Sequence, residues 1–112
     1  MARYTNLFTT TSPDSVPELK IALADTLRAC NLNLIYETQD YLVAKEKPGQ
    51  VSYTKLATIE VLINPPLSGQ HEAQVNLVVK NEELPLNRNN HCQRVFQAVN
   101  QAIHATRPWQ CA

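Results

Sequence analysis

One short segment of the sequence brings together side chains that could do chemistry. Asn90-His91-Cys92 stands at the expected start of a helix, and His104 follows later on the same helix. A cysteine at a helix N-terminus can be activated as a thiolate, with histidine as the base. Adjacent helical residues point about 100° apart, however, so His91 and Cys92 are poorly placed to share one substrate or metal. Cys92 also falls on an apolar stripe. We therefore predict a buried thiol and a surface His91 in the first turn.

Two other groups of residues have a chemical and a structural interpretation. Glu82 and Glu83 are adjacent in a segment expected to be extended, so their carboxylates should point apart and be solvated. Tyr36, Tyr41 and Tyr53 lie on neighbouring expected strands, where aromatic rings can stack on RNA bases. Cross-strand packing is the commoner role of such tyrosines, and few basic residues accompany them. We predict no enzyme activity, no cofactor, no metal site and no nucleic-acid partner.

Composition and charge support this interpretation. The chain has 112 residues with ten basic and ten acidic side chains, and 44% of its residues are hydrophobic. This length fits one globular domain, which we expect to span residues 1–112. A net charge of zero argues against general nucleic-acid binding. The sequence has only two glycines, too few for a dinucleotide-binding fingerprint.

The cysteines and the N-terminus indicate a reducing compartment. Cys30, Cys92 and Cys111 are an odd number of widely spaced cysteines, and no apolar signal-peptide core follows Met1. The longest apolar stretch is far shorter than the roughly 20 residues of a membrane span. We therefore predict free thiols, a cytoplasmic location and no integral membrane segment.

Two helices and four strands are expected to position these residues. Ser15 to Glu18 has the form of a capping box, and it predicts a helix from about Val16 to Cys30, with Asn31 as the cap beyond it. A second helix should begin at Asn89 or Asn90 and end near Ala105. Strands are expected at about residues 32–36, 41–46, 52–63 and 72–80. Residues 1–14 are predicted as an N-terminal arm or edge strand, and residues 106–112 as a C-terminal tail.

The element order α-β-β-β-β-α predicts an α+β fold. Connections between the strands are too short for helical crossovers, which favours a four-stranded antiparallel meander. Each helix has one apolar stripe, and both stripes can cover the same face of the sheet. The sequence therefore predicts a two-layer sandwich with both helices on one face.

The other face of this sheet would be uncovered yet partly apolar. This surface predicts a protein-interaction or assembly module that binds a protein partner or itself, as a dimer. We expect the partner to dock on this face and on the connection at residues 81–87. The residues expected to bind the partner are Leu56, Thr58, Glu60, Leu62, Val78, Glu82, Glu83 and Leu84. The alternative is a small apolar-ligand-binding protein with a pocket between helices and sheet. That pocket would be lined by Leu23, Leu27, Val61, Leu77, Phe96 and Val99.

Two stretches of the sequence carry a resemblance to a known family. They are residues 36–51, from Tyr36 to Val51, and residues 79–86, followed by Asn90-His91-Cys92. Together they resemble a family of small, functionally uncharacterised cyanobacterial proteins, over most of the chain up to about Ile103. The resemblance implies a cytosolic or thylakoid-surface setting and a role in photosynthetic assembly. It implies no activity, cofactor or site residue.

Overall fold

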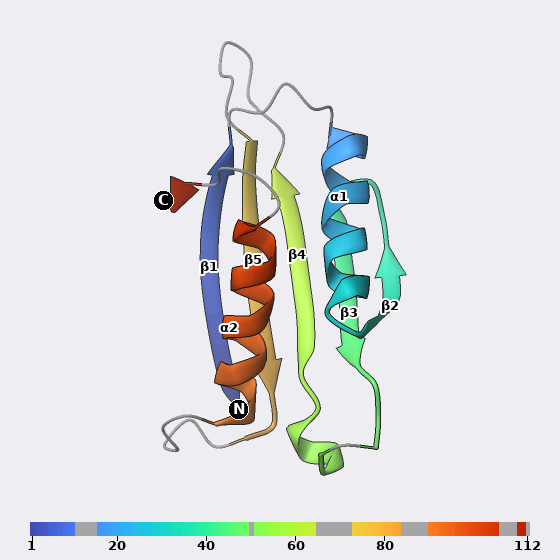
Figure 1. The fold of residues 1–112 in the computed structure, drawn as a ribbon, viewed down its shortest axis with the longest axis vertical. Helices are drawn as coiled ribbons and strands as arrows, with labels where there is room; N and C mark the ends of the chain where they lie inside the picture. Colours follow the sequence, from blue (N-terminus) through green and yellow to red (C-terminus); the bar gives the residue numbers. More distant parts are fainter. Residues whose placement is uncertain (11–15, 50, 65–72, 84–89, 106–109, 112) are drawn as a thin grey trace.

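The fold is a single antiparallel sheet with two helices packed on one of its faces (Figure 1). The computed structural model describes residues 1–10, 16–49, 51–64, 73–83, 90–105 and 110–111. The sheet has the strand order β2-β3-β4-β5-β1-β6. Its elements are β1 (Ala2–Thr10), α1 (Val16–Ala29), β2 (Leu32–Glu37), β3 (Tyr41–Glu46), the 3-10 turn η1 (Tyr53–Lys55), β4 (Thr58–Asn64), β5 (Ala73–Asn81), α2 (His91–His104) and β6 (Gln110–Cys111).

The α+β class and the antiparallel meander from β2 to β5 are confirmed, but the predicted number of strands is wrong. Residues 2–10 form a full strand, β1, whose nine residues pair with β5 from Ala2↔Asn81 to Thr10↔Ala73. Part of the predicted C-terminal tail pairs with β1 as the two-residue strand β6. The physical reason is that β5 would otherwise leave a free edge, and that Phe8 of β1 is completely buried. The order is therefore β-α-β-β-β-β-α-β.

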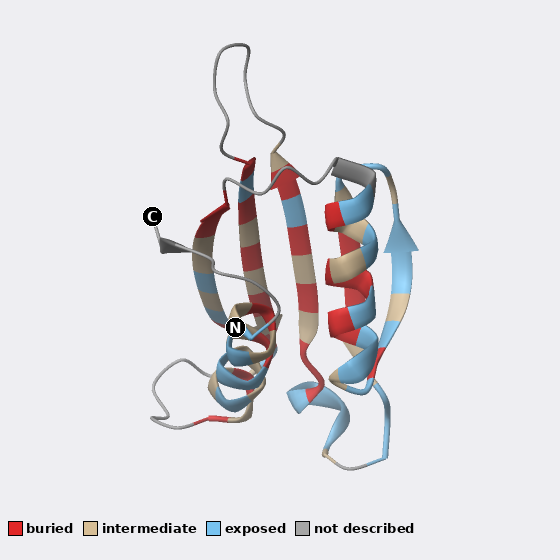
Figure 2. Ribbon diagram, turned by 45° about the horizontal axis from the view of Figure 1, so that its top comes forward, coloured by how far each residue is buried: buried red, intermediate tan, exposed pale blue. Residues whose placement is uncertain are grey.

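The hydrophobic core lies between the helices and the sheet. Burial alternates along β4 and β5, so that every second side chain faces the helices (Figure 2). The core residues on the sheet include Leu42, Ala44, Ile59, Val61, Ile63, Val75, Leu77 and Val79. Leu19, Leu23 and Leu27 of α1 and Cys92, Val99 and Ile103 of α2 complete the same cluster.

The ends of the helices follow local sequence signals. Asn90 is the N-cap of α2, and its side chain accepts a hydrogen bond from the Gln93 amide, as expected for asparagine at this position. Asn31 follows α1 with a φ of 65°, the left-handed conformation that ends many helices. Ser15 of the predicted capping box lies outside the described residues. None of the described helices is long and apolar enough to cross a membrane.

Candidate functional site

Both helices lie on one side of the sheet, so neither covers the opposite face (Figure 1). The strand register aligns its side chains in rows that run across the strands. The row nearest the end of β3 contains Lys45, Thr58, Lys80 and Arg3; the next contains Val43, Glu60, Val78 and Thr5; the third contains Tyr41, Leu62, Asn76 and Leu7.

Apolar side chains of this face lie on the neighbouring strands from β2 to β5. Tyr36 is 55% exposed and Leu62 is 38% exposed, while Tyr41, Val43 and Val78 are half-buried. The Tyr36 and Tyr41 rings meet edge to face with their centroids 6.0 Å apart, which is the cross-strand packing expected of them. We call these five residues the apolar patch.

A polar chain crosses the patch. The Tyr41 hydroxyl donates to Glu60 Oε1, and Lys80 Nζ lies 3.1 Å from Glu60 Oε2. The bond to Glu60 and burial raise the pKa of Tyr41 to about 12. The bond from Tyr41, with the charge of Lys80, holds the pKa of Glu60 below its usual value although burial opposes this. Glu60 is thus a carboxylate whose charge is already paired within the face.

The row beside the patch is basic. It holds Arg3, Lys45 and Lys80, which we call the basic row. Lys45 Nζ lies 5.6 Å from the centre of the exposed Tyr53 ring, within cation–π range. A pocket of about 220 Å³ lies at this end of the face, between Lys45, Lys80 and Tyr53.

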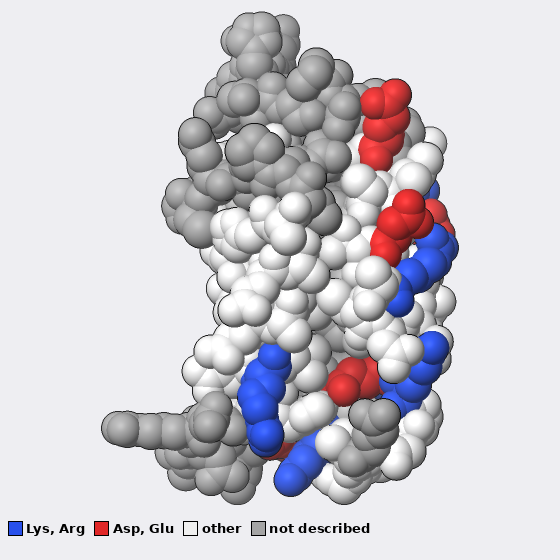
Figure 3. Space-filling model, in the orientation of Figure 1, with Lys and Arg blue, Asp and Glu red and all other residues white. Residues whose placement is uncertain are grey.

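Charge is also unevenly distributed over the helix layer. Figure 3 looks onto that layer, and Lys and Arg predominate in the lower half of the view, while most Asp and Glu lie at the upper right. The lower half is the end of the molecule where β3 and β5 finish and α2 begins (Figure 1). Although the net charge of the chain is zero, basic side chains therefore predominate at this end of the helix layer.

Four of the predicted partner-binding residues, Thr58, Glu60, Leu62 and Val78, lie together on the uncovered face. Leu56 is only 6% exposed and precedes β4; it lines the pocket at the basic end of this face but offers little surface to a partner. The predicted strand over residues 52–63 is interrupted by η1, and β4 begins only at Thr58. The Asn81 side chain donates to the Lys55 carbonyl at 3.0 Å and holds this turn against the end of β5.

The last three predicted docking residues follow β5. Glu82 is exposed, and Leu84 lies outside the described residues. Glu83 is neither a solvated loop residue nor a free docking group. Its carboxylate accepts from the amides of Cys92 at 2.9 Å and His91 at 3.3 Å, and thus caps α2.

The environment of Glu83 stabilises its charged form. Burial is the largest single influence and raises the pKa of this carboxyl. Hydrogen bonds from the Asn81 side chain, at 2.6 Å, and from the Cys92 and His91 amides outweigh it, so the pKa lies below its usual value. The prediction of a solvated carboxylate is therefore wrong for Glu83, because the first amides of α2 need an acceptor and this side chain supplies it; Glu82 is exposed.

His91 and Cys92, the candidate catalytic pair of the sequence, both make structural contacts. His91 is not a free surface residue, because its Nε2 lies 2.7 Å from Glu46 Oε1 with both side chains about one-fifth exposed, at 18% and 19%. Cys92 is buried as predicted, and its Sγ lies 3.4 Å from the Val79 carbonyl oxygen. Burial, with the nearby charges of Glu83 and Glu46, raises the pKa of Cys92 to about 11. This thiol is protonated at neutral pH and packs in the core.

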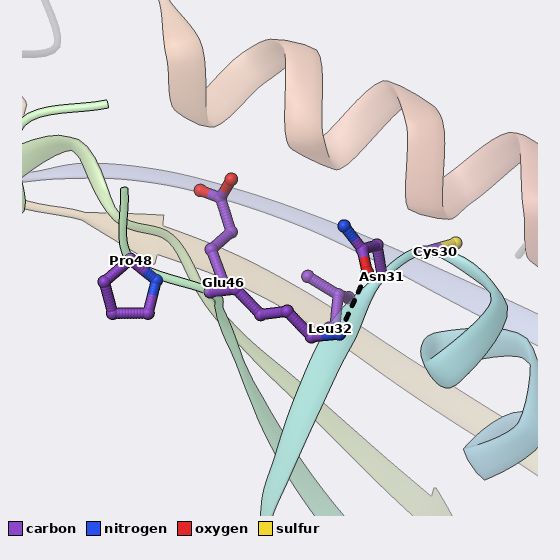
Figure 4. Close-up of a pocket in the computed structure, with 6 residues that line it drawn as sticks. Cys30, Asn31, Leu32, Glu46 and Pro48 are labelled. Atoms are coloured by element: carbon purple, nitrogen blue, oxygen red, sulfur yellow. Dashed lines mark hydrogen bonds between the residues drawn. The ribbon is translucent and has the colours of Figure 1, made fainter. Parts of the chain in front are cut away.

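The predicted apolar pocket has a different character in the structure. Leu23, Leu27, Val61, Leu77 and Val99 belong to the core cluster, and Phe96 packs against it. These side chains fill the space that an apolar ligand would need. A pocket of about 340 Å³ lies instead at the end of the helix layer, lined by Cys30, Asn31, Leu32, Glu46, Lys47 and Pro48 (Figure 4). Its lining is more polar than predicted.

No family model matches this chain, and no curated protein matches it at a significant level. The cyanobacterial resemblance of residues 36–51 and 79–86 stays a prediction. Function is therefore argued from the surface and its charges.

Proposed function

We propose that the protein is a non-catalytic interaction module that binds a partner protein through the uncovered face of its sheet. One observation carries this proposal: the apolar patch lies directly beside the basic row on a face that neither helix covers. Leu62 and Tyr36 expose apolar surface there that a partner would remove from water.

The charges of the face indicate the chemistry of the partner. Glu60 is paired with Lys80 and bonded to Tyr41, so the positive charges of Arg3 and Lys45 are in excess. A partner surface with apolar side chains flanked by carboxylates complements this arrangement. The apolar contact would supply affinity, and the carboxylates would fix orientation and speed association.

A second copy of this chain is a poorer occupant. Under a two-fold axis through the face, the basic row would meet either itself or the opposite end of the face. At that end β4 and β5 present Asn64 and Gln74, which are uncharged. Among the described strand residues of this face, Glu60 is the one carboxylate, and it is already paired with Lys80, so neither arrangement supplies Arg3 and Lys45 with a free strand carboxylate. The proposed partner is therefore a different protein, and the resemblance suggests photosynthetic assembly as its setting.

Paired charge variants test this proposal. Leu62→Asp places a carboxylate in the apolar patch, while Ile21→Asp places one on α1, where Ile21 is 57% exposed on the opposite side of the molecule. Proteins captured by the wild type would be identified, purified and measured by calorimetry. We expect Leu62→Asp and Lys45→Glu to weaken binding about tenfold or more, and Ile21→Asp to leave it unchanged.

Two results would contradict the proposal. One is a purified partner that binds the Leu62→Asp and wild-type proteins equally while Ile21→Asp weakens it. The other is sedimentation of the wild type as a dimer that Leu62→Asp dissociates, because the face would then be a self-association surface. Affinity should also fall as salt concentration rises, since screening weakens the attraction between carboxylates and the basic row.

A further inference from the structure

The pocket at the end of the helix layer has features of a small-molecule site. It lies where α1 ends and β3 ends, and its volume of about 340 Å³ is within the range of ligand sites. In Figure 4, Glu46 and Asn31 stand on two sides of it, with Leu32 between them. The pocket is on the helix side of the sheet, so it is separate from the uncovered face.

Glu46 is a fixed hydrogen-bond acceptor in this pocket. Its Oε1 accepts from the Ala57 amide at 2.8 Å and lies 2.7 Å from His91 Nε2. Among the residues that the structure describes, none donates to its Oε2. Because the side chain is only 19% exposed, water solvates that oxygen incompletely. The pocket thus holds a carboxylate oxygen that is oriented by its neighbours and still able to accept.

Lys47 does not neutralise this carboxylate. Its Nζ donates to Asn31 Oδ1 at 3.0 Å, and this bond joins the end of β3 to the end of α1 (Figure 4). Asn31 has a φ of 65°, the backbone conformation in which it ends α1 beside the pocket. The Lys47 ammonium is thereby held at Asn31 rather than against Glu46.

The end of α1 adds to the preference for a cation. The last carbonyls of a helix carry partial negative charge, and α1 ends at Ala29, immediately before the lining residues Cys30 and Asn31. Leu32 and Pro48 supply apolar walls. A carboxylate oxygen, a helix C-terminus and two apolar side chains together match a small molecule with one charged end and a short hydrocarbon body.

We propose that this pocket binds a small organic ammonium ion, whose charged nitrogen donates to Glu46 Oε2 and whose hydrocarbon part contacts Leu32 and Pro48. This pocket shares no residue with the apolar pocket that the sequence predicted between helices and sheet. Ligand binding in this pocket needs no partner protein, so its test is independent of the test of the docking face.

The test is a titration with three probes of the same size. n-Butylammonium, n-butanol and butyrate would be added to the 15N-labelled protein, and amide chemical shifts followed at Cys30, Asn31, Leu32 and Lys47. We expect saturable shifts with butylammonium only. Glu46→Gln keeps an acceptor for the Ala57 amide but removes the charge, and should weaken binding about tenfold or more. Lys47→Met removes the cation at Asn31 and should not weaken it.

Each adverse result is decisive. No saturable shift with butylammonium, or equal shifts with butanol, would overturn the proposal. Equal affinity of Glu46→Gln and the wild type would do the same. Because Glu46 also contacts His91, the unfolding midpoint of every variant would be measured, and His91→Gln would serve as the matched control. It disturbs the same contact without lining the pocket, so retained binding in that variant assigns the loss in Glu46→Gln to the carboxylate.

Discussion

The carboxylate of Glu83 accepts a hydrogen bond from the Cys92 amide at 2.9 Å and closes the N-terminus of α2. The same carboxylate accepts from the Asn81 side chain at 2.6 Å. Helix α2 is therefore tied to the end of β5 by a charged group whose lone pairs meet amides that lack intrahelical acceptors. β5 also carries Lys80 of the basic row, so the capping contact ties α2 to one of the strands that bear this row.

Removing this cap should destabilise the protein. We expect Glu83→Ala to lower the free energy of unfolding by about 1–2 kcal/mol, because two helix amides and the Asn81 side chain lose their acceptor. The exposed neighbour gives a matched control: Glu82→Ala should change the free energy by less than about 0.5 kcal/mol. Urea unfolding followed by circular dichroism measures both. Equal effects of the two substitutions would contradict the capping role.

The charged form of Glu83 should make stability depend on pH. Its pKa in the folded protein lies below the ordinary value of 4.5, and Glu60 shifts in the same direction. A carboxyl with a lowered folded pKa stabilises the protein above its unfolded pKa, and this contribution is lost as pH falls through the folded value. We expect the unfolding free energy to decrease below about pH 4.5. Glu83→Gln should flatten this decrease, whereas a profile unchanged from the wild type would contradict the prediction.

Tyr41 should lose its proton only at high pH. Its pKa is raised to about 12 by the hydrogen bond to Glu60. A raised folded pKa gives stability that is complete below the unfolded pKa of about 10 and is lost as pH rises through the folded value. Tyrosinate absorbance should therefore show a step near pH 12 that Tyr41→Phe removes. Glu60→Gln should move that step to lower pH, and an unmoved step would show that Glu60 does not cause it.

Local sequence patterns account for much of this fold. The alternation along Ile59, Val61 and Ile63 predicts a strand with one buried face, and the apolar stripe through Cys92, Val99 and Ile103 predicts α2. Asn90 and Asn31 mark helix ends by their own chemistry. These features depend on residues that are neighbours in the chain, which is why the sequence alone predicts them.

Contacts between distant residues account for what the sequence did not predict. The pairing of β1 with β5 joins Ala2 to Asn81, and no local pattern specifies that partner. The Glu46–His91 contact spans 45 residues and changes His91 from a surface group to part of a polar cluster. Glu83 offered one usable signal, since an acidic residue shortly before an N-cap can fold back onto the helix amides.

The thiols of Cys30 and Cys92 should differ in reactivity. Cys92 is completely buried, and its pKa is raised to about 11. Cys30 is partly exposed, and partial burial raises its pKa as well. Iodoacetamide should label Cys30 in the folded protein and Cys92 only on unfolding. Peptide mass spectrometry after timed labelling measures this. Labelling of Cys92 at the rate of Cys30 in native buffer would contradict the buried position of its thiol.

Substitution of a core residue in the N-terminal strand β1 should lower the free energy of unfolding as much as a core substitution elsewhere in the sheet. Phe8 is completely buried, and its ring meets the His104 ring of α2 edge to face at 4.8 Å between centroids. Phe8→Ala should lower the free energy of unfolding by about 3–5 kcal/mol, the usual cost of removing a large core side chain. Leu7, the preceding residue, points to the uncovered face, and Leu7→Ala should cost less than half as much.

If residues 2–10 were a dispensable arm, both substitutions would have small and similar effects. A large difference between them would instead place β1 in the core of the fold, and with it Arg3, whose position in the basic row depends on the pairing of β1 with β5.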